Sequence, residues 1–299
     1  MYNFKTLRKL ILLLTIPILF LFSSLSFADK TATKGKMVET TKVADGVYVF
    51  RWWVYRNIFI VTDEGVIATD PVNPKAAKML MQEIRKVTDK PIKYVVYSHN
   101  HWDHISGGKI FKEAGAKFVS HENCVKHFNK RPNPVVVSPD ITFSDKHMLT
   151  LGGKKIELQY FGKNHGDCAI TMRLPEEKMI FIVDLVTPER VPFRTMPDFL
   201  PDEWIRSLYE IEKLDFDTVI PGHGPHTMPA TSPRIVVQQQ REYLEDLIAA
   251  VKVEWDKGVH NPEKLRKTVK LPKYAKWRQY DAWLPMNIER IWGYYHMGW

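Results

Sequence analysis

The sequence feature that most constrains this chain is a six-residue segment carrying three histidines and one aspartate. Residues 99–104 read HNHWDH and follow an apolar run at 92–97 that predicts a strand. Residues two apart in an extended chain point the same way, so His99 and His101 can hold one metal ion. Asp103 and His104 can diverge past a bend toward a second ion. This donor set favours zinc, with iron and manganese as alternatives; the competing interpretation is a solvated polar loop.

Three more metal-capable side chains follow predicted strands downstream. His165 follows a strand at 156–161, Asp184 follows the apolar run at 179–183, and His223 follows a strand at 218–220. Functional side chains concentrate on loops at strand ends, and the glycines beside the two histidines permit tight turns there. Together with the first segment, these residues complete two coordination sets.

The remaining chain alternates predicted strands and helices, which indicates an α/β (α+β) fold of two mixed sheets covered by helices. Further strands are expected at 47–50, 57–61, 65–69, 117–119 and 169–174, and helices at 75–87, 108–114, 202–214 and 232–255. We expect one domain over 41–258. Residues 259–299 are expected to be an irregular, aromatic C-terminal extension packed on that domain.

The N-terminal 28 residues match a secretory signal peptide. Lys5, Arg8 and Lys9 precede an apolar run at 10–22, and Ser26-Phe27-Ala28 provides a cleavage site. An uncleaved N-terminal anchor is the alternative. Cleavage would leave a flexible leader at 29–40 and a periplasmic or secreted protein, without stable membrane insertion.

Net charge bears on the class of partner, and the cysteine content bears on the compartment. The formal net charge is +9 and falls to +6 without Lys5, Arg8 and Lys9. No dense basic stripe with interleaved aromatic residues accompanies it, so the sequence does not favour a nucleic-acid partner. Cys124 and Cys168 are the only cysteines. They can pair in an oxidising compartment, or Cys168 can be a free thiol near the metals.

This ordered set of motifs resembles the metallo-β-lactamase-fold hydrolase superfamily over about Val43 to His226. The resemblance implies an αββα sandwich with the metals at one edge. It implies a first metal on His99, His101 and His165, and a second on Asp103, His104 and His223. It also implies that Asp184 bridges the two metals and that Asp70 supports the site from behind.

The chain departs from the family pattern at a few positions. Residues 165–168 read HGDC where the family commonly has His-Thr-x-Gly, and Val183 stands where Gly is usual. Asp184 occupies a position at which zinc β-lactamases usually carry Cys or Ser. The aspartate is more similar to the thioesterase, lactonase and general hydrolase branches, and secreted members associated with periplasmic quinoprotein systems share this layout.

The resemblance implies a binuclear zinc hydrolase with two zinc ions per chain. A hydroxide bridging the zinc ions would attack an ester, lactone, thioester or β-lactam carbonyl, with Asp103 as the catalytic residue that orients it. A side activity on β-lactams is part of this expectation. The sequence contains no Gly-x-Ser-x-Gly elbow and no glycine-rich phosphate loop. An iron-dependent oxidoreductase and a non-catalytic metal- or cofactor-binding accessory protein of a quinoprotein system remain open.

The partner is expected to be a small-molecule substrate, and the sequence leaves both its identity and the oligomeric state open. Several aromatic or apolar side chains lie near the expected mouth of the site. They either line an apolar pocket or pack in the core: Trp52, Trp53, Tyr55, Trp102, Phe193 and Met196.

Overall fold

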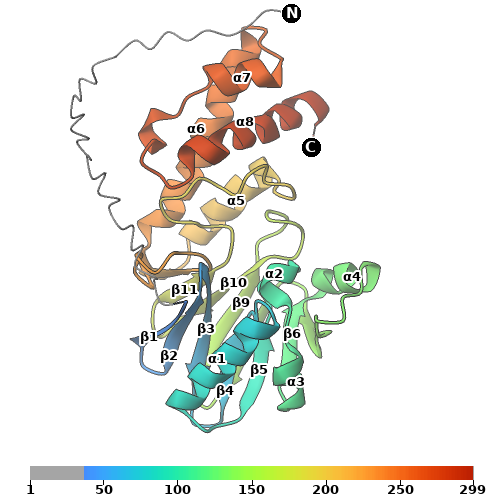
Figure 1. Ribbon diagram of the computed structural model, residues 1–299, viewed down its shortest axis with the longest axis vertical. Helices are drawn as coiled ribbons and strands as arrows, with labels where there is room; N and C mark the ends of the chain where they lie inside the picture. Colours follow the sequence, from blue (N-terminus) through green and yellow to red (C-terminus); the bar gives the residue numbers. More distant parts are fainter. Residues whose placement is uncertain (1–36, 299) are drawn as a thin grey trace, which may run out of the picture. The chain divides into compact units, whose positions relative to one another are not determined.

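Two β-sheets with helices on their outer faces make up the part of the chain that the computed structural model describes, residues 37–298 (Figure 1). The first sheet has the strand order β1-β2-β3-β4-β5-β6-β7, antiparallel up to β4 and parallel beyond it. Its strands are β1 Val38–Ala44, β2 Val47–Trp52, β3 Tyr55–Val61, β4 Val66–Thr69, β5 Ile92–Val96, β6 Lys117–His121 and β7 Ile141–Phe143.

The second sheet has six strands in the order β13-β12-β11-β10-β9-β8. Only the β11–β12 pair is parallel. The strands are β8 Lys146–Leu151, β9 Lys154–Tyr160, β10 Ile170–Leu174, β11 Met179–Ile182, β12 Thr218–Pro221 and β13 Ser232–Pro233.

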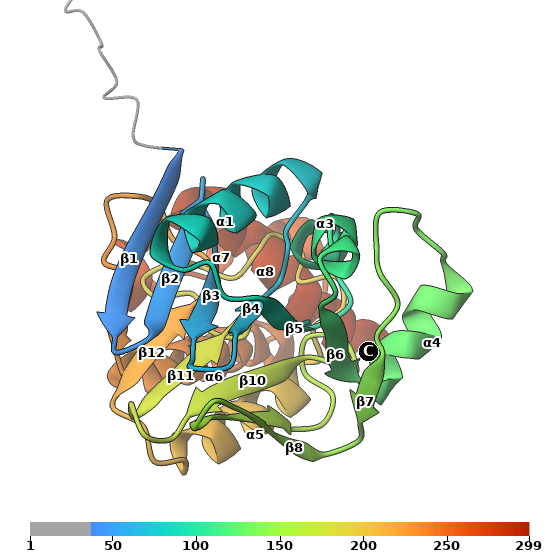
Figure 2. The same ribbon diagram turned by 90° about the horizontal axis from the view of Figure 1, so that it is seen from below.

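Helices cover both outer faces, and Figure 2 shows α1 and α3 on one side of the sheets and α5 on the other. The helices are α1 Pro74–Val87, α2 Trp102–Ile105, α3 Lys109–Glu113, α4 Glu122–Lys130, α5 Pro201–Glu212, α6 Ile235–Asp256, α7 Pro262–Thr268 and α8 Tyr280–Met297, with the 3-10 turn η1 Pro272–Tyr274. Among residues 37–298, no helix is long and apolar enough to cross a membrane.

Alternating side chains in the strands explain the layers. Successive residues of a strand point to opposite faces of the sheet. In β3, Ile58 and Ile60 point into the core between the sheets, whereas Phe59 packs with α1 on the outer face. In β11, Phe181 points inward, and Ile180 joins the cluster beneath α5 and α6. Both faces of each sheet are therefore buried, which requires the helical layers.

Local sequence also sets the boundaries of α1. The Asn73 side chain accepts hydrogen bonds from the backbone N–H groups of Lys75 and Ala76, and Pro74 occupies the first turn. Such an N-cap stabilises a helix by ~1 kcal/mol. The buried face consists of Ala76, Ala77, Leu80 and Ile84.

The C-terminal segment is helical, so the prediction of an irregular segment after residue 257 is wrong. Its helices α7 and α8 share one apolar cluster with α5 and α6, to which Leu265, Leu284 and Ile288 contribute. The predicted flexible leader is also wrong where it overlaps β1, which begins at Val38. The predicted signal peptide and residues 29–36 lie outside the described residues.

Candidate metal centre

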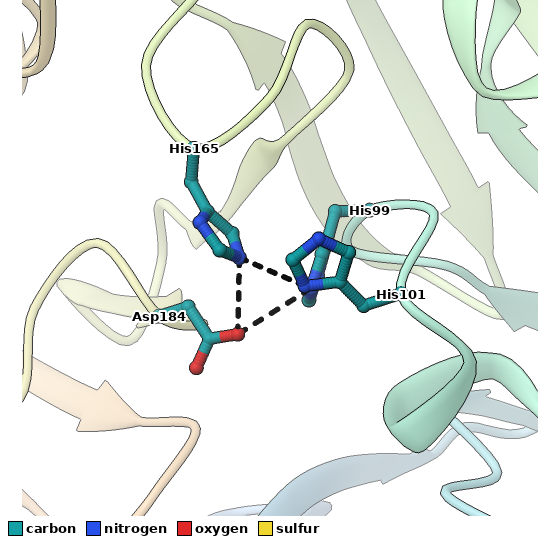
Figure 3. A group of neighbouring side chains, drawn as sticks. All are labelled: His99, His101, His165 and Asp184. Atoms are coloured by element: carbon teal, nitrogen blue, oxygen red, sulfur yellow. Dashed lines mark hydrogen bonds and ion pairs between the residues drawn. The ribbon is translucent and has the colours of Figure 1, made fainter. Parts of the chain in front are cut away.

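The residues singled out from the sequence lie at one edge of the sandwich, where several strands end. His99 follows β5, His165 follows β9, Asp184 follows β11 and His223 follows β12, while His104 lies on α2. Figure 3 shows His99, His101, His165 and Asp184 pointing toward one another, with His99 and His101 on one loop and the other two side chains on loops of their own. The topology therefore brings together side chains that are far apart in the sequence.

The first group consists of His99, His101, His165 and Asp184. The Asp184 Oδ2 atom lies 3.4 Å from His99 Nε2 and 3.3 Å from His165 Nε2. His165 Nε2 lies 3.0 Å from His101 Nδ1. Ligands at ~2.1 Å from a tetrahedral zinc ion are themselves ~3.4 Å apart, so this spacing fits a zinc-sized ion.

The second group consists of His104, Asp184 and His223. Asp184 Oδ1 is 2.7 Å from His223 Nε2, and Asp184 Oδ2 is 3.4 Å from His104 Nε2. The facing Nε2 atoms of His104 and His223 are 3.2 Å apart. Asp184 thus contributes oxygen atoms to both groups, which is the geometry needed for a carboxylate that bridges two ions.

Contacts with Asp198 indicate which ring nitrogens of the first group can face a cation. His101 Nε2 lies 2.6 Å from Asp198 Oδ2, and His165 Nδ1 lies 3.4 Å from Asp198 Oδ1. Only the His101 contact is a hydrogen bond, so the neutral His101 ring carries its proton toward Asp198, which leaves its Nδ1 atom as a bare lone pair. This lone pair faces His165 Nε2 at 3.0 Å, and a cation between the two nitrogens would bind both. The donor set therefore fits a metal ion.

Burial and mutual charge shift the pKa values in this cluster. Burial lowers the pKa of the His99 imidazole well below its usual range. Burial has the same tendency at His104, but the Asp184 carboxylate outweighs it and raises the pKa of His104 to about 9. Burial opposes ionisation of Asp184, yet the His223 and His104 rings hold its pKa well below the usual range. The metal-free cluster thus carries a proton on His104 at neutral pH, which a metal would displace.

Asp103 lies beside the cluster but in neither group. Its Oδ2 atom is 3.8 Å from His104 Nε2 and accepts a hydrogen bond from the Tyr55 hydroxyl at 3.2 Å. The Asp103 side chain is 57% exposed. Its predicted roles as metal ligand and catalytic residue stay predictions, as do the ligand roles of the six residues that the groups contain.

Two aspartates next to the sheet edge adopt backbone conformations uncommon for L-residues. Asp184 has φ 62° and Asp70 has φ 30°. Such a conformation costs ~1–2 kcal/mol and persists where surrounding contacts enforce it. Asp70 is fully buried, and its Oδ1 accepts a hydrogen bond from the Ser98 N–H at 2.8 Å. Burial raises the pKa of Asp70 to about 6. Asp70 thereby fixes the backbone next to His99.

Asp198 is the functional candidate that sequence reasoning missed. It lies in the loop between β11 and α5, not at a strand end, so the pattern that revealed the other residues does not mark it. Burial opposes its ionisation, but the hydrogen bond from His101 and the charges of His165 and His101 hold its pKa at about 2. Asp198 is therefore a carboxylate at neutral pH and orients the His101 ring, with His165 Nδ1 3.4 Å from its other oxygen.

A disulfide fixes the loop that carries His165. Cys124, at the start of α4, bonds Cys168, three residues after His165. The pairing that the sequence left open is thus present, and neither of these thiols is free. Of the aromatic and apolar candidates, Tyr55 and Phe193 line the cavity over the cluster, whereas Met196 is buried in the core.

Comparison with known proteins agrees with this geometry. The model of the metallo-beta-lactamase superfamily matches residues 51–223. The chain is 27% identical over 187 residues to 2,4-dinitroanisole O-demethylase subunit alpha of Nocardioides sp. (strain JS1661), covering 62% of this chain and 57% of that protein. It is 24% identical over 298 residues to the linear primary-alkylsulfatase of Pseudomonas sp. (strain ATCC 19151), covering 80% of this chain and 55% of that protein. The chain thus spans little more than half the length of either relative.

A solved structure extends the match through the fold. A stereoselective inverting sec-alkylsulfatase from Pseudomonas sp. superimposes with a TM-score of 0.71 at 18% identity, over 87% of this chain and 50% of that one. At this identity the match concerns the fold alone, and it confirms the predicted architecture of two mixed sheets flanked by helices. The family match covers more than half of the chain and includes both donor groups, so the chain belongs to the metallo-β-lactamase superfamily.

Proposed function

We propose that this protein is a binuclear zinc hydrolase that cleaves an ester, lactone, thioester or β-lactam carbonyl in a small molecule. The observation that carries the proposal is the pair of donor groups sharing Asp184, with facing imidazole nitrogens 3.0 and 3.2 Å apart. Two divalent ions bound there would lower the pKa of a shared water toward ~7 and polarise the substrate's carbonyl oxygen.

The chain's own residues would orient the reacting groups. Tyr55 lines the cavity and donates its hydroxyl proton to Asp103, which fixes the direction of that carboxylate. Burial raises the pKa of Tyr55 to about 12, so the phenol stays a donor at neutral pH. Asp103 would accept a proton from the attacking water, and Asp198 would hold His101 in the ligating tautomer.

Sulfate-ester hydrolysis is a second candidate. It is supported by the alkylsulfatase relative, whose match covers 80% of this chain rather than the superfamily segment alone. Metal ions held by the same donor groups could assist attack of water at sulfur or at the ester carbon, because negative charge develops on the sulfate oxygens in either case.

We also propose that the protein works in the periplasm or outside the cell. The Cys124–Cys168 disulfide supports an oxidising compartment, since disulfides are rare in reducing ones. Cell fractionation with detection of the chain tests this, and recovery in the cytoplasm with both thiols reduced would contradict it.

The decisive experiment couples metal analysis to a substrate panel. Purified protein is analysed for zinc, iron and manganese, then assayed with 4-nitrophenyl acetate, a lactone, a thioester, a cephalosporin, 4-nitrophenyl sulfate and dodecyl sulfate. His101→Ala should lose zinc and activity together, whereas His147→Ala, a histidine on β8 outside both groups, should keep both. Turnover that survives complete metal removal would refute the proposal.

A further inference from the structure

The cavity over the donor groups contains a cationic side chain that the hydrolytic scheme does not use. The cavity measures about 310 Å³, and Arg190 lines it together with Tyr55, Asp103 and Asp184. The Arg190 Nε atom is buried without a hydrogen-bond partner, and no residue in the described range 37–298 accepts a hydrogen bond from its guanidinium. A buried donor without an acceptor costs ~1–3 kcal/mol, so its retention calls for an explanation.

The surrounding chain holds Arg190 in place from two sides. Its backbone N–H donates to Thr187 O at 3.1 Å, and the residue pairs with Arg278 in an isolated bridge. The Arg190 guanidinium lies over the Trp283 ring of α8, with Cζ 5.5 Å from the ring centroid. This cation–π contact fixes the plane of the guanidinium without using an N–H group as a hydrogen-bond donor. The side chain is therefore prepositioned for an incoming acceptor.

The charge balance of the cavity favours an anion as that acceptor. Asp103, Asp184 and Asp198 supply three negative charges, whereas two divalent ions would bring four positive charges. Asp184 is the carboxylate that acts on Arg190, and two bound metal ions would engage its oxygens. With metals in place, the positive charge of Arg190 has no counter-ion.

We propose that Arg190, held over Trp283, binds an oxyanionic group of the substrate, a carboxylate or a sulfate, and so selects anionic small molecules. The planar fork of the guanidinium matches the two oxygens of such a group. Phe193, half exposed, and Pro192 provide an apolar wall beside it, and a cavity of about 310 Å³ suits a small substrate. This inference rests on the proposed hydrolytic function and adds the substrate's charge to it.

The test compares a neutral and an anionic ester that share one leaving group. 4-Nitrophenyl acetate and 4-nitrophenyl hydrogen succinate are assayed with wild type, Arg190→Gln and Arg190→Lys. For the succinate we expect Arg190→Gln to raise KM by about 10–100-fold with kcat little changed, and Arg190→Lys to restore part of the loss. The acetate should be unaffected. The control is Arg85→Gln, an exposed arginine near the end of α1 that does not line the cavity.

Further arms separate failure of the inference from failure of the function. 4-Nitrophenyl sulfate replaces the succinate in one arm, and a selective effect there assigns the subsite to sulfate. If no ester is cleaved, calorimetric titration of the zinc-loaded protein with glutarate and with inorganic sulfate tests Arg190 alone. Binding that Arg190→Gln abolishes supports the subsite. Equal anion binding by both proteins, or equal loss on the neutral and anionic esters, overturns it.

Discussion

Substituting Asp198 tests whether one carboxylate sets the metal affinity of the first group. Its Oδ2 atom lies 2.6 Å from His101 Nε2, a distance typical of a charge-assisted hydrogen bond worth ~1.5–3 kcal/mol. The Asp198 side chain is 34% exposed, so solvent screening favours the lower end of that range. About 1.5 kcal/mol corresponds to roughly tenfold in affinity. Loss of the weaker, 3.4 Å contact with His165 should lower the zinc affinity further. The total is expected to stay within the 10–100-fold loss of metal affinity typical when a residue that supports a metal ligand is replaced.

The assay is competition between the protein and a chromophoric chelator, which reports two zinc dissociation constants without requiring turnover. Asp198→Asn should weaken one ion by about 10–100-fold and leave the ion on His104, Asp184 and His223 nearly unchanged. Asp202→Asn is the matched control, because that carboxylate accepts hydrogen bonds from the Glu203 N–H at 3.0 Å and the Tyr294 hydroxyl at 3.5 Å, neither of which belongs to the donor groups. Unchanged affinities in Asp198→Asn would refute the reasoning. Equal weakening of both ions with a lowered Tm of the metal-free protein would assign Asp198 a structural role instead.

Three further predictions follow from the contacts around the site. Because the pKa of metal-free His104 is about 9, zinc binding must displace its proton. The apparent zinc affinity should therefore rise as the pH is raised from 7 to 9 and then level off. An affinity that does not change with pH would contradict this. Replacing Cys124 and Cys168 by Ala opens a loop of separation 44 and should lower the free energy of unfolding by up to ~4 kcal/mol in denaturant titrations, a difference that reducing agent abolishes. Asn287→Ala removes hydrogen bonds to two loop carbonyls and to a tyrosine hydroxyl, and should cost ~3 kcal/mol, whereas exposed Asn129→Ala should cost little.

The sequence predicted the sheet edge well because its signals are local. An apolar run followed at once by a histidine or aspartate marks the end of a buried strand, and strand ends of neighbouring strands meet at one edge. For that reason the sequence alone places His99, His165, Asp184 and His223 together. The same logic did not place Asp103, which the structure keeps 3.8 Å from His104 and partly in solvent.

Asp198 and the C-terminal helix were missed because no local periodicity marks them. Both Asn287 and Arg290 of α8 are buried polar residues, so they interrupt the apolar stripe that would identify a helix. They are buried because they donate hydrogen bonds to the loop between β11 and α5, more than 90 residues earlier in the chain. Pro285 inside α8 weakens the helical signal further. These pairings depend on the completed fold and cannot be inferred from spacing.

The C-terminal helix couples the two halves of the proposed site. The superfamily match ends at His223, yet Trp283 of α8 lies against Arg190, and Arg290 of α8 donates to Met196 O and Phe199 O on either side of Asp198. One helix thus contacts both the loop of the carboxylate that orients His101 and the cation proposed to bind the substrate. Changes in α8 should therefore alter substrate charge preference and the affinity of the first ion together. The ion on His104 and His223 has no such contact with α8 and should be retained.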